Sequence, residues 1–251
     1  MQIKPLDFSL AYRFAESTVR AIKNPSDCEI EDVIGDFLGV GEATFFQKIL
    51  KPTKVTLLHD FIKNINFEGI EWETGHLDHD YLINTYGPCI EMAGYEIPDW
   101  FKEGELGEHI WELDSILDLV SSKITEATFH ILFADRDFLF CFSKFVASFI
   151  KEQDESKSSV FKKSGIVKRA SFLPRWLRNA VFHRDKGRCQ ICGKDLTGLF
   201  RPEFDIHLDH MLPLEQSGTN DPTNFQLLCE HCNSSKGKKV VVMKQLVYTY
   251  W

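Results

Sequence analysis

The chain has 251 residues, of which 43% are hydrophobic and 26% charged, and this composition excludes a wholly disordered chain, a collagen-like repeat and a coiled-coil rod. Its net charge of −8 is unevenly distributed. Residues 1–155 contain 13 Lys and Arg against 29 Asp and Glu, a net charge of −16, whereas residues 156–251 contain 16 against 8, a net charge of +8. The asymmetry indicates two domains with different partners, of which only the second is suited to a polyanion.

A membrane span needs about 18 consecutive apolar residues, and no such run occurs. The nearest candidate, 129–150, is interrupted by Asp135, Arg136, Asp137 and Lys144. The N-terminus also lacks the basic region and apolar core that are typical of a signal peptide. We therefore expect a cytoplasmic protein without membrane contact, in which paired cysteines bind metal rather than form disulfides.

Helical spacing of apolar residues dominates the first half of the chain. It predicts helices over residues 6–23, 29–38, 42–51, 54–66, 106–120 and 124–153. Residues 68–104 are rich in Gly, Pro and aromatic residues, so we expect them to be irregular with short strands. Cys28, Cys89 and Cys141 are isolated, and each is interpreted as a small buried residue. These features describe a helical, acidic accessory domain over residues 1–153, which is suited to contact with another protein or to dimerisation.

A polar, serine-rich segment follows, and residues 154–165 are interpreted as a linker. The second domain is expected over residues 166–251. Its predicted elements are helices over 174–186 and 230–239 and strands over 205–209, 224–228 and 240–250. The predicted fold class is α+β.

Two CxxC pairs lie in this second domain, Cys189 with Cys192 and Cys229 with Cys232. Two intervening residues allow both thiolates of a pair to reach one ion, and four thiolates suit tetrahedral Zn²⁺. Gly193 after the first pair permits the positive φ that such a knuckle needs. The alternative is that the pairs are ordinary buried thiols or a redox pair.

The 36 residues between the pairs carry the chemistry. In order, residues 174–240 contain a basic helix ending at Arg184-Asp185, CxxCG, Asp209-His210 with Pro213, Gly218, Asn224, the second CxxC and Asn233-x-x-Lys236. This order resembles the HNH endonuclease family, the ββα-metal nucleases, over about a quarter of the chain. The resemblance implies that the second domain has the ββα-metal fold with a four-cysteine zinc site. The first domain resembles no family that we can name.

Hydrolysis of a phosphodiester needs a base, a Lewis acid and an orienting frame. His210 is the expected general base, because its neutral imidazole is available near pH 7. Asp209 is the expected ligand of Mg²⁺ or Mn²⁺, which prefer hard oxygen donors. Successive strand residues face opposite sides, so these two can flank one site only at a strand end or bulge.

The resemblance adds two further residues to the site. It implies that Asn224 braces the loop and orients the base, and that Asn233 ligates the catalytic metal through its side-chain oxygen. The sequence therefore contains Asp-His…Asn…Asn rather than a literal His-Asn-His. Each of the four residues also has a plain alternative: a turn cap for Asp209, a surface or core histidine, a turn residue for Asn224 and a first-turn helix residue for Asn233.

Phosphate contacts would come from basic residues on both sides of the segment between the two CxxC pairs. Such contacts bind DNA with little sequence information. The candidates are Arg175, Arg178, Arg184, Lys186, Arg188, Lys236, Lys238 and Lys239. The alternative is an ordinary solvated face. His207 is expected to be structural or to face DNA, and His231 to be an exposed knuckle residue.

These features favour a metal-dependent DNA endonuclease, which the resemblance implies leaves a 5′ phosphate and a 3′ hydroxyl. A setting in restriction or phage defence is suggested by analogy alone. Two alternatives stay open. One is a zinc-knuckle nucleic-acid-binding protein without catalysis, and the other is an effector nuclease restrained by its own acidic domain.

Overall fold

The computed structural model describes residues 9–24, 40–76, 78–92, 94–152, 159–162, 165–198 and 206–241. The described residues form two compact units. Unit 1 comprises residues 9–24 and 59–132, and unit 2 comprises residues 40–58 and 133–241. No helix among the described residues is long and apolar enough to cross a membrane.

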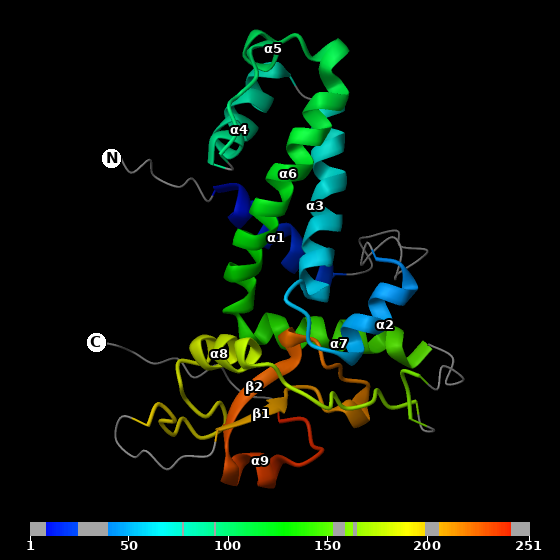
Figure 1. The fold of residues 1–251 in the computed structure, drawn as a ribbon, viewed down its shortest axis with the longest axis vertical. Helices are drawn as coiled ribbons and strands as arrows, with labels where there is room; N and C mark the ends of the chain where they lie inside the picture. The colour runs from blue at the N-terminus through cyan, green and yellow to red at the C-terminus, as the bar shows by residue number, and fades with distance from the viewer. Residues whose placement is uncertain are drawn as a thin grey trace. The chain divides into compact units, whose positions relative to one another are not determined.

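Unit 1 is built from helices. They are α1 (Ser9–Lys23), most of α3 (Leu57–His76), α4 (His79–Met92), α5 (Asp99–Glu103) and most of α6 (Leu106–Phe133) (Figure 1). The helices α3 and α6 run antiparallel, because His59 stacks on Phe129 at 3.8 Å while Lys63 pairs with Asp118 at 2.7 Å.

The core of unit 1 joins α1, α4, α5 and α6. Its largest buried side chains include Phe14, Tyr86 and Phe101, and Cys89 packs among them as a small buried residue. The prediction of an irregular region over residues 68–104 was wrong, because α3 continues to His76 and is followed by α4 and α5.

The prediction that one helix ends near residues 121–123 and another begins there was also wrong. A single helix, α6, continues to Phe133 and the next helix, α7 (Arg136–Glu152), begins after it. Asp135 explains this position, because its carboxylate accepts a hydrogen bond from the Phe138 N–H at 3.0 Å and caps the new helix. The predicted helix over 29–38 lies outside the described residues.

Unit 2 holds the cysteines and the Asp-His pair. Its elements are α2 (Glu42–Leu50), α7, α8 (Arg175–Arg184), β1 (Ile206–His210), β2 (Phe225–Cys229) and α9 (Glu230–Lys236). The strands pair antiparallel, with Asp209 opposite Gln226 and His210 opposite Phe225. The predicted strands and both flanking helices are confirmed within two or three residues at each end, and the predicted strand over 240–250 falls almost wholly outside the described residues.

Two segments from the first half of the chain belong to unit 2. Residues 40–58 and 133–152 pack with the cysteine-bearing region, so the division between the units differs from the expected boundary at 154–165. The described part of that expected linker is also packed: Phe161 and Val167 are buried and form a β-bridge, and the Phe161 ring meets Phe46 edge to face. The contact between Phe161 and Phe46 places this described part of the expected linker against α2.

Candidate active site and metal centre

The four CxxC cysteines converge on one point in unit 2. The first pair lies in the turn after α8, Cys229 ends β2 and Cys232 lies in the first turn of α9. All four Sγ atoms lie within 4.8 Å of one another, and those of Cys192 and Cys229 are 3.9 Å apart. Zn–S bonds of about 2.3 Å place tetrahedral sulfurs about 3.8 Å apart, so the cluster fits one zinc ion.

Backbone hydrogen bonds favour the thiolate form of one of these cysteines, Cys189. Burial raises the pKa of the Cys189 thiol, but hydrogen bonds from the N–H groups of Cys192, Cys229 and Ile191 outweigh burial and lower the pKa to about 7. Burial raises the pKa of the Cys232 thiol. Gly193 has φ 72° and donates its N–H to the Cys189 carbonyl at 2.8 Å, which closes the knuckle as the sequence predicts.

Asn224 fixes the loop that joins β1 to β2. Its Oδ1 accepts from the Leu212 N–H at 2.8 Å, and its Nδ2 donates to the carbonyls of Leu212 and Thr219, each at 2.9 Å. Gly218 allows this folding, because a Cβ there would lie 2.0 Å from the Leu212 carbonyl oxygen. Asn224 thus lies where the resemblance implies that it braces the loop, but the hydrogen bonds of its side chain go to Leu212 and Thr219 and not to His210.

His210 ends β1 and is buried, with its ring 4.5 Å from that of Phe225. Its Nε2 lies 3.2 Å from Asn220 Oδ1. The Asn220 amide is oriented by the backbone: Nδ2 donates to the carbonyls of Ile49 and Lys168, and Oδ1 accepts from the Ala170 N–H. Because Oδ1 only accepts, the proton of neutral His210 is held on Nε2, and Nδ1 is the basic nitrogen.

The surroundings of His210 keep the ring neutral. Burial, together with the positive charge of Arg169, lowers the pKa of His210 to about 4, although the hydrogen bond to Asn220 and the charge of Asp209 act in the opposite direction. A neutral imidazole is the form that can accept a proton.

Asp209 precedes His210 at the end of β1 and lies opposite Gln226 on β2. Its Oδ2 accepts from Gln226 Nε2 at 2.9 Å and pairs with Lys236 Nζ at 2.8 Å. Lys236 also donates to the His210 carbonyl at 2.9 Å, so it ties α9 to the end of β1. Asp209 Oδ1 receives no hydrogen bond from the part of the chain that the structure describes.

Asn233 lies one turn before Lys236 on α9, at the i, i+3 spacing that puts both on one face. Its side chain is half-buried and makes no hydrogen bond to another described residue. A carboxylate oxygen and an amide oxygen are hard donors of the kind that Mg²⁺ and Mn²⁺ prefer, so Asp209 and Asn233 fit such an ion.

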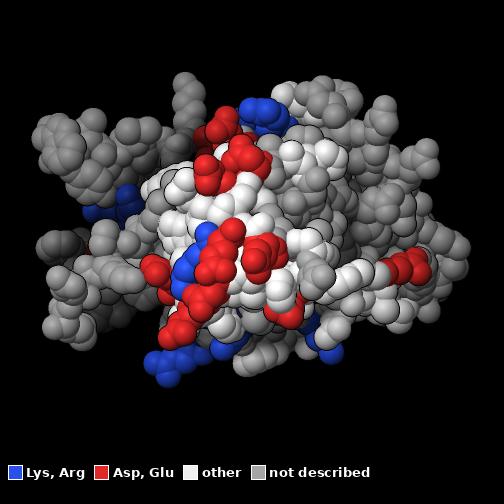
Figure 2. All heavy atoms as spheres, turned by 90° about the horizontal axis from the view of Figure 1, so that it is seen from above, with Lys and Arg blue, Asp and Glu red and all other residues white. Residues whose placement is uncertain are grey.

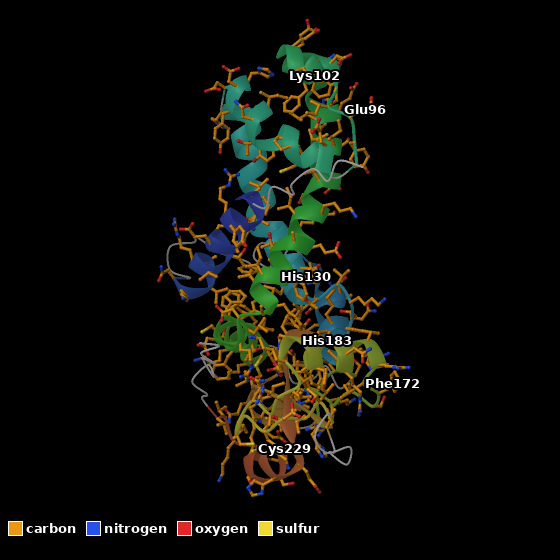
Figure 3. All side chains as sticks on the ribbon, turned by 90° about the vertical axis from the view of Figure 1, so that its left-hand side faces the viewer. Glu96, Lys102, His130, Phe172, His183 and Cys229 are labelled. Atoms are coloured by element: carbon orange, nitrogen blue, oxygen red, sulfur yellow. The ribbon has the colours of Figure 1, made fainter. Side chains whose placement is uncertain are left out.

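Six of the eight expected DNA-contacting residues lie at the surface. Arg175, Arg178, Lys186, Lys238 and Lys239 are exposed and Arg188 is half-buried. Lys238 pairs with Glu215 at 3.1 Å. Phe172, which is 71% exposed, lies at the outer edge of unit 2 in Figure 3, three residues before Arg175.

The other two, Arg184 and Lys236, differ from the expectation. The Arg184 side chain is 2% exposed and pairs with Asp185 at 2.8 Å, and the Lys236 side chain is 1% exposed on Asp209. In this structure both are buried ionic contacts rather than a surface for DNA.

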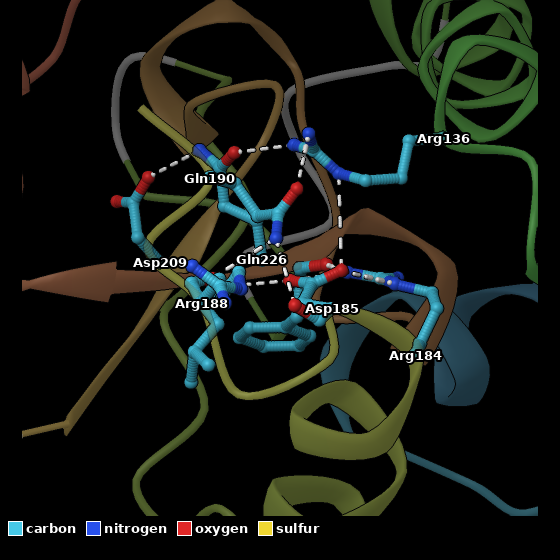
Figure 4. A network of polar contacts seen from close by, with 9 residues as sticks. Arg136, Arg184, Asp185, Arg188, Gln190, Asp209 and Gln226 are labelled. Carbon is cyan, nitrogen blue, oxygen red and sulfur yellow. Dashed lines mark hydrogen bonds and ion pairs between the residues drawn. The ribbon is translucent and has the colours of Figure 1, made fainter. Parts of the chain in front are cut away.

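Sequence reasoning assigned no role to several polar residues that hold this site. Asn220 contacts His210. Gln226 contacts Asp209, and Arg136 contacts Gln226 (Figure 4). Asn220 lies between the two CxxC pairs, where a polar residue shortly before a proline is easily interpreted as part of a turn. Arg136 is one of four charged residues in the largely apolar stretch 129–150, and its sequence neighbours do not indicate a contact with Gln226.

Among families of known proteins, the HNH endonuclease family matches residues 189–239. Residues 189–239 form an HNH endonuclease domain. The domain begins at the first cysteine of the cluster and ends just after α9, so it includes all four cysteines, Asp209, His210, Asn224 and Asn233. Neither the curated proteins nor the solved structures that were compared match the chain.

An HNH domain indicates a nuclease, and with it the binding of nucleic acid and the use of a divalent metal. The cysteine cluster could hold a metal ion of its own, because its four residues are separate from Asp209 and Asn233. Unit 1 lies outside the matched residues.

Proposed function

We propose that the chain is a cytoplasmic, metal-dependent DNA endonuclease whose HNH domain hydrolyses phosphodiester bonds. The observation that carries the proposal is the state of His210 within that domain. Its ring is neutral with the proton held on Nε2, and the neighbouring carboxylate of Asp209 has one oxygen that receives no hydrogen bond from the described residues. Binding alone requires neither feature.

In this proposal His210 Nδ1 takes the proton from the attacking water, and Nε2–H stays on Asn220. Asp209 Oδ1 and the amide oxygen of Asn233 would hold Mg²⁺ or Mn²⁺. When bound, the ion supplies Lewis-acid stabilisation of the charge that develops on the phosphate. Asn224 keeps the loop closed, and the cysteines hold Zn²⁺ as a structural ion. The products would carry a 5′ phosphate and a 3′ hydroxyl.

The decisive experiment is incubation of the full chain with supercoiled plasmid in Mg²⁺, in Mn²⁺ and in EDTA. We expect nicked or linear DNA with either metal and none with EDTA. The same assay shows whether one or both strands are cut.

One observation favours a second candidate function, a zinc-knuckle DNA-binding protein without catalysis. Lys236, whose side chain is buried, already neutralises the half-buried Asp209, so this carboxylate needs no metal for charge balance. A shifted plasmid band without cleavage in any of the three conditions would support the binding protein and contradict the nuclease.

The acidic first part of the chain, residues 1–153, is proposed to bind a protein partner, to form dimers or to restrain the nuclease. Exposed carboxylates gather over residues 91–105, at the end of unit 1 where Figure 3 labels Glu96 and Lys102. Figure 2 shows carboxylates in the middle of that face and fewer basic side chains. Such a surface repels phosphates and attracts basic groups.

We predict that E96Q/E103Q/E105Q in the full chain tightens DNA binding at low salt by about threefold, and that this gain disappears near 0.3 M salt as screening shortens to below about 8 Å. Fluorescence anisotropy with labelled duplex measures it, and K238Q/K239Q serves as the control that weakens binding. A truncated chain is unsuitable because α2 and α7 pack within unit 2. Weaker binding of the triple variant at every salt concentration would show that the acidic surface assists recognition.

A role in restriction or phage defence forms the last part of the proposal. It predicts fewer phage plaques on cells that express the chain than on cells that express a His210→Ala variant. Equal plaque counts for a panel of phages would argue for another setting.

A further inference from the structure

Arg136 is the first residue of α7 and lies 53 positions before the HNH domain, yet its guanidinium reaches the domain's interior. Its side chain is 13% exposed. Nη1 donates to Gln190 Oε1 at 2.9 Å, and Nη2 donates to Gln226 Oε1 at 2.8 Å (Figure 4). The guanidinium therefore forks between two glutamines that come from different elements.

The direction of these hydrogen bonds is fixed, because an arginine only donates. Each glutamine must present its oxygen to Arg136 and its amide nitrogen elsewhere. Gln226 Nε2 then donates to Asp209 Oδ2 at 2.9 Å, whereas Gln190 Nε2 donates to the backbone carbonyls of Asp185 and Arg188. Only one branch of the fork ends at the candidate metal ligand.

The fork is held in place by a buried carboxylate. Asp185 Oδ1 lies 3.8 Å from Arg136 Nε and 2.8 Å from Arg184 Nε, and its Oδ2 accepts from the Leu227 N–H at 2.7 Å. Leu227 is the neighbour of Gln226 on β2, so the backbone and the side chain of this strand segment are oriented by the same ionic cluster. A buried bidentate arginine gives more geometric restraint than a single-point cation can.

We propose that Arg136 is a positioning residue of the nuclease: acting through Gln226, it holds Asp209 Oδ2 so that Oδ1 faces the divalent ion. The proposal rests on the proposed function of Asp209 as a metal ligand. It makes α7 a working part of the nuclease, although α7 lies outside the HNH match and before the expected linker.

The two branches provide a matched pair of variants, Gln226→Met and Gln190→Met, in the full zinc-loaded chain. Each substitution removes one buried hydrogen-bond acceptor of Arg136 and keeps the side-chain volume. Each should therefore lower the free energy of unfolding by a similar amount, about 1–3 kcal/mol. Of the two substitutions, only Gln226→Met removes a hydrogen-bond donor of Asp209, and the contact of Asp209 with Lys236 remains in both variants. Mn²⁺ affinity is measured from the EPR signal of free Mn²⁺ without DNA, beside plasmid cleavage as a function of Mn²⁺ concentration.

We expect Gln226→Met to weaken Mn²⁺ binding by about 10–100-fold, the usual effect of losing a hydrogen bond to a metal ligand, and Gln190→Met to change it by less than about threefold. Half-maximal cleavage should shift to higher Mn²⁺ by the same factor. Equal shifts in the two variants would mean that the network is merely structural, and would overturn the proposal.

A second readout needs neither metal nor activity. In the metal-free chain, NMR follows hydrogen exchange of the Gln226 side-chain amide in the wild type and in Arg136→Lys, which keeps the charge beside Asp185 but loses the fork. We expect exchange at least about tenfold faster in the variant, with the Gln226 backbone N–H still protected within β2. Unchanged exchange would overturn the proposal, whereas a wild-type chain that cuts no DNA would overturn only the nuclease function.

Discussion

Replacement of His210 by Ala or Gln should lower the rate of plasmid cleavage by about 10²–10⁴-fold at saturating metal, which is the usual contribution of a general base. His210→Gln is the more informative variant. Its amide N–H can still donate to Asn220 Oδ1, as the imidazole Nε2–H does, and its length fills much of the buried space against Phe225. It lacks a basic nitrogen at the position of Nδ1.

The loss should appear in kcat, and binding of uncut duplex should remain within a few-fold of the wild type. His231→Ala is the matched control, because His231 is an exposed histidine of the same HNH domain and belongs to α9. It should cut at the wild-type rate. Near wild-type cleavage by His210→Gln would refute the role assigned to this ring, and a large loss in His231→Ala would point to a second histidine in the site.

The local parts of the site could be predicted from the sequence because each depends on residues close together. The CxxC spacing alone brings two thiols to one point, and Gly193 permits the turn that follows. The strand that ends in His210 and the loop braced by Asn224 follow from a short run of alternating and turn-forming residues.

The helices of unit 1 show where composition misleads. Gly87 and Pro88 indicate a turn, but Leu82, Tyr86 and Ile90 recur at the four-residue spacing of one helical face and are all fully buried in α4. The free energy gained by burying this face outweighs the preference of Gly87 and Pro88 for a turn. The start of α7 at Arg136 depends on Asp135. In the sequence, the charge of Asp135 is interpreted as an interruption of an apolar run, but its carboxylate caps the helix.

The supporting contacts could not be predicted, because they join positions far apart in the chain. The partners of Asn220 include Ile49, 171 residues earlier, and those of Gln226 include Arg136, 90 residues earlier. No periodicity or motif connects such positions. They explain why residues 40–58 and 133–152 pack with the HNH domain rather than with unit 1.

The zinc site should decide whether the HNH domain folds at all. Cys189, Cys229 and Cys232 are part of the same buried cluster as Leu177 and Phe225, so loss of the ion opens the core of the domain. Structural zinc contributes about 10–16 kcal/mol in small zinc domains, which is comparable to the whole stability of a typical domain, about 5–15 kcal/mol. The sulfur cluster is therefore expected to be a condition of folding.

We predict about one tightly bound zinc per wild-type chain and none in Cys189→Ser or Cys229→Ser, as measured by elemental analysis after dialysis. Both variants should lose the cooperative melting transition of unit 2 and all cleavage. Cys141→Ser, at a half-buried and isolated position on α7, is the control and should keep the zinc and the transition. Folded, active protein without zinc would refute the assignment.

The loss of zinc should also affect the candidate catalytic metal site at Asp209. Gln190 lies between the first two cysteines, its N–H donates to the Leu227 carbonyl, and its side chain accepts one branch of the Arg136 fork. A chelator that removes zinc slowly should therefore abolish Mn²⁺ binding at Asp209 at the same rate as it removes zinc. EDTA added briefly should remove only the weakly held ion, and activity should return when Mg²⁺ is restored. Recovery of full activity by Mg²⁺ after complete zinc removal would show that the two centres are independent.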